Sequence, residues 1–412
     1  MAKIAFLVGS FHPYYSANGI CVKRLCDEFI LQGHSVTVFS RRSYKQSSKK
    51  IIDGINIQSF KSKNIDTLGD MILMTRKGLF KFFLIFLSKS LYLLNAFLTM
   101  LFFPKISHKY SKNIIDIIDK YLEQNTIDIF VSVYTPIESV VAAKYIHEKY
   151  GQKIVLYTLD SINGGYVSRI IGKRRAEKRM FIFEQSMFKS FHKILLLNSQ
   201  KHVYSTEKYS VFKEKFVYVD IPLVTFKIEK PLNLVKKEID IVYTGTLQKG
   251  IKDPSRTLEI LNSTNIKNIN VHFYGNTTNI KLYPERYDNL SIFIHKHVEY
   301  DQINGILQKS DFLLNIGSLN KNQIPSKIFE YISFGKPIIS TFFINEEPSL
   351  PYLSKYKNVF LLDEKIKAEE IIGQLDEFIA HYQNREIDDI DDLKKKFITN
   401  TPKYFVDLIL NI

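Results

Sequence analysis

Short apolar runs alternate with helix-like segments along this chain, and the alternation occurs in two separate stretches. At its start, Lys3–Val8 has the composition of a buried strand, Asn18–Gln32 carries apolar residues at helical spacing, and Ser35–Ser40 resembles a second strand. A strand, a helix and a second strand in this order form a unit whose strands pair in parallel. The pattern therefore predicts a doubly wound α/β domain.

The same pattern continues along the first stretch and starts again in the second. The further elements predicted are strands at Ile127–Val133, Lys153–Thr158, Lys193–Asn198, Ile239–Thr244, Asn270–Tyr274, Phe312–Ile316 and Pro337–Ser340, and helices at Glu138–Lys149, Asp253–Leu261, Tyr300–Gln308 and Ser326–Ser333. The 412 residues are too many for one ordinary core. We therefore expect two α/β domains, over residues 1–222 and 237–385, with 386–412 forming a C-terminal helix that crosses back to the first domain.

The formal net charge of +15 suggests that the protein binds an anionic partner. Nucleic acid, an anionic membrane surface and phosphate-bearing substrates are the three candidates. The basic residues gather beside an apolar helix rather than among exposed stacking aromatics, so nucleic acid is not expected. The two cysteines, Cys21 and Cys26, lie in one predicted helix, which fits a reducing compartment. Met1–Gly9 is interpreted as a buried strand and not a signal peptide, so a cytoplasmic location is expected.

The apolar segment Leu79–Phe103 interrupts the α/β pattern and predicts a long helix within residues 77–105. Its polar residues follow one narrow stripe: Lys77, Lys81, Ser88, Tyr92, Asn95 and Thr99. Its flanks are basic, and Asp66 and Asp70 are the acids between residues 61 and 112. A helix that contacts an anionic membrane is favoured over a core helix, and both are favoured over a full span. We expect the protein to be peripheral on the inner face of the plasma membrane.

Phosphate groups bind to unpaired backbone N–H groups and to cations, and one segment supplies both. Ser326 starts a predicted helix directly after Pro325, and Lys327 adds a mobile cation. Glu330 follows one helical turn later, within reach of ribose hydroxyls. The preceding strand delivers this helix start to the carboxyl edge of the sheet, where open α/β folds bind ligands. A plain strand-loop-helix with Ser326 as the N-cap is the alternative.

The segment from Pro325 to Pro337, PSKIFEYISFGKP, resembles the donor-site helix of GT-B glycosyltransferases of the family-four kind, especially those that build bacterial capsules and surface polysaccharides. The resemblance implies two Rossmann-like doubly wound domains that face a central cleft. It implies that Glu330 binds the nucleotide ribose and that Ser326 and Lys327 lie against the diphosphate. The family's Glu-x7-Glu pattern has Asn322 at its first position here, which can hydrogen-bond a sugar hydroxyl without carrying charge.

Other donor-site residues follow from the same resemblance. The segment Ile241–Leu247 resembles the strand and glycine turn that open the second lobe, with Gly245 in the turn. The basic residue expected after this turn is Lys249 or Lys252, of which we favour Lys252; each could equally be a solvated charge. His297 and Val298 lie where backbone groups receive the base, and Gly19 lets a first-lobe helix approach the donor.

Three first-lobe residues are candidates for the catalytic step. Asp160 ends a predicted strand and is the best carboxylate for contacting or deprotonating an acceptor hydroxyl, although it could equally cap a turn. Tyr134 ends another strand, where many relatives have a histidine. His12 lies in the loop after the first strand, where a lone histidine is more often packed or solvated.

These residues together imply transfer of a sugar from a nucleoside diphosphate-sugar to a hydroxyl of a glycan, expected to be lipid-linked, in bacterial surface polysaccharide synthesis. The resemblance implies retention of configuration. Lysines and a helix start can stabilise the leaving diphosphate, so no metal or cofactor is expected. A catalytically inactive scaffold with the same fold, a partner in a polysaccharide-assembly complex, is the alternative.

Overall fold

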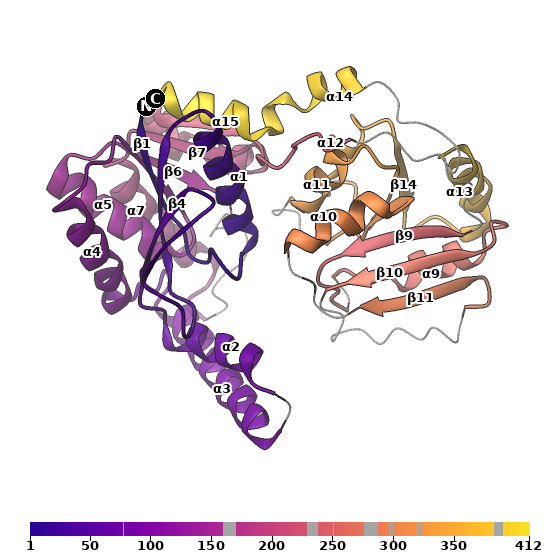
Figure 1. The fold of residues 1–412 in the computed structure, drawn as a ribbon, viewed down its shortest axis with the longest axis horizontal. Helices are drawn as coiled ribbons and strands as arrows, with labels where there is room; N and C mark the ends of the chain where they lie inside the picture. Colours follow the sequence, from indigo (N-terminus) through magenta and orange to yellow (C-terminus); the bar gives the residue numbers. More distant parts are fainter. Residues whose placement is uncertain are drawn as a thin grey trace. The chain divides into compact units, whose positions relative to one another are not determined.

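The computed structural model describes residues 1–76, 78–159, 170–228, 238–249, 251–275, 287–295, 298, 300–319, 324–382 and 390–412. The chain divides into two compact units (Figure 1). Unit 1 contains Met1–Pro222 and Pro402–Ile412, and unit 2 contains Leu223–Thr401.

Unit 1 is built on an eight-stranded sheet in the order β3-β4-β2-β1-β5-β6-β7-β8. The strands are β1 (Lys3–Leu7), β2 (Ser35–Arg41), β3 (Lys49–Ile52), β4 (Ile55–Phe60), β5 (Ile129–Val133), β6 (Ile154–Thr158), β7 (Lys193–Leu197) and β8 (Phe216–Val219). All neighbours are parallel except β3 and β4, which form an antiparallel hairpin. The expectation that the first half ends with the strand at Lys193–Asn198 is wrong, because β8 follows it.

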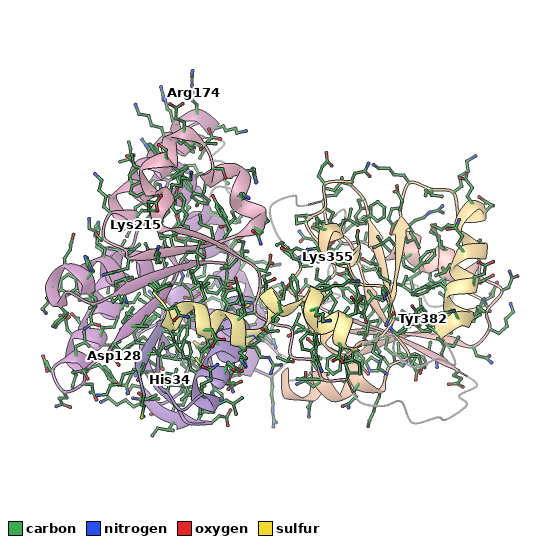
Figure 2. All side chains as sticks on the ribbon, turned by 90° about the horizontal axis from the view of Figure 1, so that it is seen from above. His34, Asp128, Arg174, Lys215, Lys355 and Tyr382 are labelled. Atoms are coloured by element: carbon green, nitrogen blue, oxygen red, sulfur yellow. The ribbon has the colours of Figure 1, made fainter. Side chains whose placement is uncertain are left out.

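Helices cover both faces of this sheet. They are α1 (Ala17–Leu31), α2 (Asn64–Met74), α3 (Leu79–Leu101), α4 (His108–Leu122), α5 (Ile137–Tyr150), α7 (Lys173–Phe188) and α8 (Lys201–Tyr204), with 3-10 helices η1 (Asn198–Gln200) and η2 (Glu207–Lys215). One core joins α4, α5 and α7 to the sheet through side chains such as Ile114, Ile146 and Met180. Lys215 caps α7, because its Nζ donates to the carbonyls of Phe188, Lys189 and Phe191 at 3.1, 2.8 and 2.7 Å (Figure 2).

The C-terminal region is not one helix over residues 386–412. It contains α14 (Ile390–Lys396) in unit 2, a short 3-10 helix η4 (Ile398–Asn400), and α15 (Pro402–Leu410) in unit 1. The α15 helix packs on α1, and the ring of Phe405 lies 5.7 Å from the ring of Tyr157. The last helix therefore completes the face of unit 1 opposite α4 and α5.

Unit 2 has a six-stranded parallel sheet in the order β11-β10-β9-β12-β13-β14. The strands are β9 (Ile239–Thr244), β10 (Ile269–Tyr274), β11 (Leu290–His295), β12 (Phe312–Asn315), β13 (Ile338–Phe342) and β14 (Val359–Asp363). The helices are α9 (Ser255–Asn262), α10 (Tyr300–Lys309), α11 (Lys327–Ser333), α12 (Leu350–Leu353) and α13 (Ala368–Tyr382), with α14 as above. The core on one face contains Leu258 of α9 and Leu375 of α13.

Helices α2 and α3 form a hairpin that projects beyond the end of the unit 1 sheet where β4 finishes (Figure 1). The hairpin replaces a short connection between β4 and α4. Its base is fixed to the sheet by Arg41, whose guanidinium holds both carboxylate oxygens of Asp70 at 2.9 and 3.1 Å. Arg41 also donates to Ser10 Oγ at 2.8 Å, which ties the loop after β1 to the same point.

Candidate functional site

The strand order of unit 2 reverses between β9 and β12, which are neighbours in the sheet. In open parallel sheets, the loops that follow the two strands at such a switch point diverge and leave a crevice at the carboxyl edge. Gly245 directly follows β9, and Gly317 lies two residues after β12. The two glycines therefore mark the edge at which a ligand is expected.

Two glycine turns pack backbone against backbone at this edge. Gly245 and Gly275 have φ values of +139° and +132°, which residues other than glycine rarely adopt. A Cβ on Gly275 would overlap the carbonyl oxygen of Gly245, and the N–H of Gly245 donates to the carbonyl of Tyr274 at 2.7 Å. The turns after β9 and β10 thus expose main chain where bulkier residues would block it.

Lys327, the first residue of α11, crosses to the end of β9. Its Nζ donates to the carbonyl of Thr244, lies 5.1 Å from the ring centre of Tyr243, and occupies the space that a Cβ on Gly245 would fill. Burial, together with the nearby charge of Lys252, lowers the pKa of Lys327 to about 7, and Glu330 opposes the shift. Burying a charged ammonium is unfavourable, and a bound anion would offset that cost. The position of Lys327 therefore favours an anionic ligand.

Lys252 is the second cation at this edge. Its backbone pairs with Gln248 through hydrogen bonds of 3.1 and 2.8 Å, which closes the tight turn after β9. Lys252 is half-buried with a pKa lowered by burial, whereas Lys249 is exposed. Within the described residues, neither Lys252 nor Lys327 forms an ion pair with a carboxylate. The geometry thus favours Lys252 over Lys249 as the partner of Lys327.

Tyr331 fixes the end of β9 from the next turn of α11. Its hydroxyl accepts from the N–H of Thr244 at 3.0 Å and lies 3.1 Å from Thr244 Oγ1. Burial raises the pKa of Tyr331 to about 12, so the hydroxyl stays neutral. In the sequence Tyr331 is one of several large apolar residues of this helix, and nothing in that pattern distinguishes it.

Glu347 is a buried carboxylate behind the loop that follows β12. It is 2% exposed, and its Oε1 accepts from Ser349 Oγ at 2.9 Å. A Cβ on Gly317 would lie 2.6 Å from Glu347 Oε2 and 2.5 Å from the Thr341 carbonyl oxygen. Burial raises the pKa of Glu347, and the charge of Lys252 opposes the rise. Glu347 was not among the predicted site residues, because no motif marks it.

Among the remaining residues predicted at this edge, the structure describes Pro325, Ser326, Glu330 and Val298. Ser326 occupies the N-cap position directly before α11, as the alternative interpretation has it, but its backbone angles are helical and its side chain makes no capping hydrogen bond. The carbonyls of Pro325 and Ser326 accept the first helical hydrogen bonds, at 3.3 and 3.2 Å. Glu330 and Val298 are half-buried. His297 and Asn322 lie outside the described residues.

In unit 1, Gly19 and His12 flank the loop after β1. Gly19 is buried, a Cβ there would overlap the carbonyl oxygen of Ser10, and its N–H donates to Ser16 Oγ at 3.1 Å. Gly19 therefore serves close packing of α1 on this loop. His12 Nδ1 lies 2.8 Å from Lys50 Nζ. Because a lysine ammonium can only donate, Nδ1 is the acceptor and the proton of a neutral ring is on Nε2.

Tyr134, predicted as a catalytic residue, is a core residue. It is completely buried, and its hydroxyl donates to Glu184 Oε1 at 2.9 Å. Glu184 is buried too and also accepts from the hydroxyls of Tyr204 and Tyr209, the former at 2.8 Å. The sequence position at the end of β5 was correct, but the side chain turns into the core. Asp160 lies outside the described residues.

Residues 255–388 match a protein family described as glycosyl transferase-like. No curated protein matches the chain. Among solved structures, the chain resembles sucrose-phosphate synthase from Thermosynechococcus elongatus, with 10% identity, a TM-score of 0.61, and coverage of 100% of this chain and 98% of that one. A glycosyltransferase from Rickettsia africae has 15% identity, a TM-score of 0.59, and coverage of 100% and 97%.

A third similar structure is WaaG, a glycosyltransferase involved in lipopolysaccharide biosynthesis, with 12% identity, a TM-score of 0.54, and coverage of 98% of this chain and 99% of that one. These likenesses confirm the predicted fold class: a mixed α/β chain with two parallel-sheet Rossmann-like domains, the GT-B fold of glycosyltransferases. The matched family segment contains α9 to α13 and therefore includes Lys327 and the switch-point loop after β12.

Proposed function

We propose that this chain is a glycosyltransferase that moves a sugar from a nucleoside diphosphate-sugar to a hydroxyl of a glycan acceptor. The observation that carries the proposal is the pair Lys252 and Lys327, which converge at the switch point of unit 2 beside the main chain of Gly245. Two cations whose charges repel each other, and which form no salt bridge among the described residues, fit a diphosphate. The glycosyl transferase-like match over residues 255–388 supports a sugar ester of that diphosphate.

In the proposed reaction, the bond between the anomeric carbon and the diphosphate oxygen breaks while a bond to the acceptor oxygen forms. Negative charge grows on the leaving diphosphate, and Lys252, Lys327 and the first N–H groups of α11 stabilise it. This electrostatic contribution is the part a metal would otherwise supply, so the proposed transfer is metal-independent. Glu330 accepts hydrogen bonds from the ribose, Val298 and His297 receive the base, and Asn322 contacts the donor sugar.

The acceptor proton requires a base on the unit 1 side. Asp160 keeps its proposed role of contacting or deprotonating the acceptor hydroxyl. His12, with Nδ1 held by Lys50, presents Nε2 as a donor and is proposed to hydrogen-bond the acceptor rather than deprotonate it. Tyr134 has no part in the proposal because its hydroxyl is committed to Glu184. Retention of anomeric configuration is proposed from the resemblance to family-four enzymes.

The proposed acceptor is a lipid-linked glycan in bacterial surface polysaccharide synthesis, at the inner face of the plasma membrane. The likeness to WaaG and to WaaB, a lipopolysaccharide outer core galactosyltransferase, supports this class of acceptor. The apolar hairpin of unit 1 supports a membrane location.

The direct test is calorimetric binding and transfer with a panel of uridine, guanosine, thymidine and cytidine donors, using the full chain. One nucleoside diphosphate-sugar is expected to bind and to be consumed. The variant Lys327→Met should lose this binding, and Lys249→Met, on the exposed part of the same turn, should retain it. A chain that binds none of these donors or their nucleoside diphosphates is not a glycosyltransferase.

A catalytically inactive scaffold with this fold is the second candidate, favoured by Asn322 at the first position of the Glu-x7-Glu pattern. Such a scaffold would bind a nucleotide without turning over its sugar ester. Release of nucleoside diphosphate in the presence of acceptor, measured with the donor that binds, separates the two.

A further inference from the structure

The α3 helix turns an apolar face outward. Most of its exposed apolar side chains fall on one side when the residues are projected at 3.6 per turn. They are Leu79, Phe82, Phe83, Phe86, Leu93, Leu94, Phe97 and Leu101. Phe82 is 72% exposed and Phe86 is 65% exposed, whereas Leu84, on the opposite side, is 3% exposed. A contiguous outward apolar surface of this kind marks an interaction site.

Part of the polar stripe of the same helix faces inward. Lys81, Ser88 and Thr99 are half-buried on the side of Leu84, whereas Tyr92 and Asn95 of the same stripe are exposed. Lys81 Nζ donates to the carbonyl of Thr75 at 3.0 Å, and Lys105 Nζ donates to Asn95 Oδ1 at 2.9 Å. This orientation is the reverse of a helix folded for contact with water, whose apolar stripe faces the core.

The polar groups on the outward side are few and are compatible with a lipid environment. Ser90 donates its hydroxyl to the carbonyl of Phe86 at 3.0 Å, so the hydroxyl needs no water. Lys89 is exposed, and a long lysine side chain can extend its ammonium to the membrane interface. The outward face is therefore suited to hydrocarbon.

The charge around the hairpin indicates what covers this face. Of its two acids, Asp70 is buried against Arg41 at 2.9 Å and Asp66 is half-buried. The exposed charges are cations: Lys61, Arg76, Lys89 and Lys109. A second copy of the same positive hairpin would be repelled, whereas an anionic lipid surface would be attracted.

By length and composition alone, α3 is long and apolar enough to cross a bilayer. The attachment of the hairpin argues against a crossing. Lys63 Nζ at 2.7 Å and the N–H of Ser107 at 3.1 Å both donate to Glu138 Oε1 in the first turn of α5. The chain therefore leaves and returns at one point. The other leg of the hairpin, α2, has 11 helical residues, about 17 Å, which is too short for a hydrocarbon core of about 30 Å.

We propose that α3 is a monotopic anchor, whose outward face inserts into one leaflet of an anionic bilayer without crossing it. The hairpin leaves unit 1 at the carboxyl edge of the sheet, where the loop after β1 carries His12. Insertion therefore holds this edge at the lipid surface. If the proposed function is correct, the first domain meets a lipid-linked acceptor within the plane of the membrane.

The test uses an environment-sensitive fluorophore on a cysteine introduced as Phe86→Cys. The native Cys21 and Cys26 are buried, which limits background labelling. Val211→Cys, 75% exposed elsewhere in unit 1, is the matched control. With phosphatidylglycerol-containing vesicles, emission from position 86 should shift to the blue and be quenched by brominated lipids. The control position should not change, and phosphatidylcholine vesicles should give at least a tenfold weaker response.

Three results would overturn the proposal. The first is a fluorophore at position 86 that stays water-exposed with both vesicle types. The second is a blue shift of its emission without vesicles, in proportion to protein concentration, which would indicate self-association. The third is a cysteine introduced as Gly78→Cys whose thiol reacts with a reagent enclosed in the vesicle lumen, which would indicate a full span. A Phe82→Ser, Phe86→Ser double variant should lose vesicle binding at least tenfold while retaining nucleotide binding. Loss of anchoring and loss of donor binding are thereby read separately.

Discussion

Replacing Lys327 with methionine should make the protein more stable and, at the same time, a poorer donor binder. Lys327 carries a cation into a largely desolvated position, with the carbonyl of Thr244 as its hydrogen-bond acceptor and Lys252 nearby. Methionine keeps an unbranched side chain of similar length and removes the charge. Stability should rise and donor affinity should fall, because the charge of Lys327 destabilises the folded state and stabilises the bound diphosphate.

The magnitude follows from the pKa of Lys327, which falls from 10.5 to about 7. Compared with the unfolded chain, the folded state holds the Lys327 proton unfavourably below pH 7 and has released it above pH 7. This costs about 5 kcal/mol at pH 6 and about 2 kcal/mol at pH 9. Loss of the hydrogen bond to Thr244 takes back about 1 kcal/mol. The variant should therefore gain about 4 kcal/mol at pH 6 and about 1 kcal/mol at pH 9.

The sign of the pH dependence is fixed by the direction of the shift. Between pH 7 and 10.5 the unfolded chain holds a proton on this lysine that the folded chain has released, so the stability of the wild type rises with pH. Denaturant titration of the full chain at pH 6 and pH 9 measures the difference between Lys327→Met and wild type. Lys249→Met, exposed on the same turn, should show no pH-dependent difference.

Donor binding supplies the second half of the measurement. A lost charge-assisted bond to phosphate should weaken the binding of a nucleoside diphosphate-sugar by about ten- to a hundredfold. Wild-type binding should take up protons above pH 7, because the diphosphate restores the charge of Lys327. An equal stability gain at pH 6 and pH 9, or unchanged donor affinity, would refute the assignment of a desolvated phosphate-binding lysine.

Three further substitutions test separate parts of the site. Gly245→Ala should destabilise unit 2 by about 1–3 kcal/mol, because φ is +139° and the new Cβ overlaps the Lys327 ammonium. Calorimetric unfolding measures this loss of stability, and an unchanged transition would contradict the close packing. Glu330→Ala should weaken nucleoside diphosphate binding about tenfold but leave inorganic diphosphate binding unchanged, as a ribose contact requires. Tyr134→Phe should cost about 1 kcal/mol of stability without altering the transfer rate, because among the described residues the Tyr134 hydroxyl hydrogen-bonds to Glu184 alone. A large loss of transfer rate would support a catalytic role for Tyr134.

Periodicity located many of the parallel strands, such as β1, β6 and β9, and about half of the helices, but not β8, β14, α4, α7 or α13. The predicted range of β9 matches the observed one, and those of β1 and β6 differ from the observed ranges by one residue. The β3–β4 hairpin and the edge strand β11 were not predicted. β3 begins with the charged residues Lys49 and Lys50, and polar residues such as Gln58 interrupt the apolar run of β4, which is mostly buried. β11 is apolar in sequence and was missed although it carries an apolar signal.

The candidate site shows the same limit more sharply. Lys327 was predicted from its place at a helix start and Gly245 from the resemblance, and the structure brings the two residues together. Glu347 and Tyr331 were not predicted, because their roles depend on contacts between strands that are distant in sequence. Tyr134 was predicted at the correct strand end, yet alternation along a strand cannot show which way a residue turns after the last paired position.

The attachment of the hairpin to Glu138 has a consequence for the engineering of the chain. Because Lys63 and Ser107 meet the same carboxylate oxygen, the intervening segment begins and ends at nearly one point in space. A segment that starts and ends at one point can be shortened without moving the elements on either side, and domains tolerate changes of length at such positions. Replacing it with a short glycine-serine linker from residue 63 to residue 107 should leave the β4-to-α4 connection intact and give a detergent-free form suited to crystallisation.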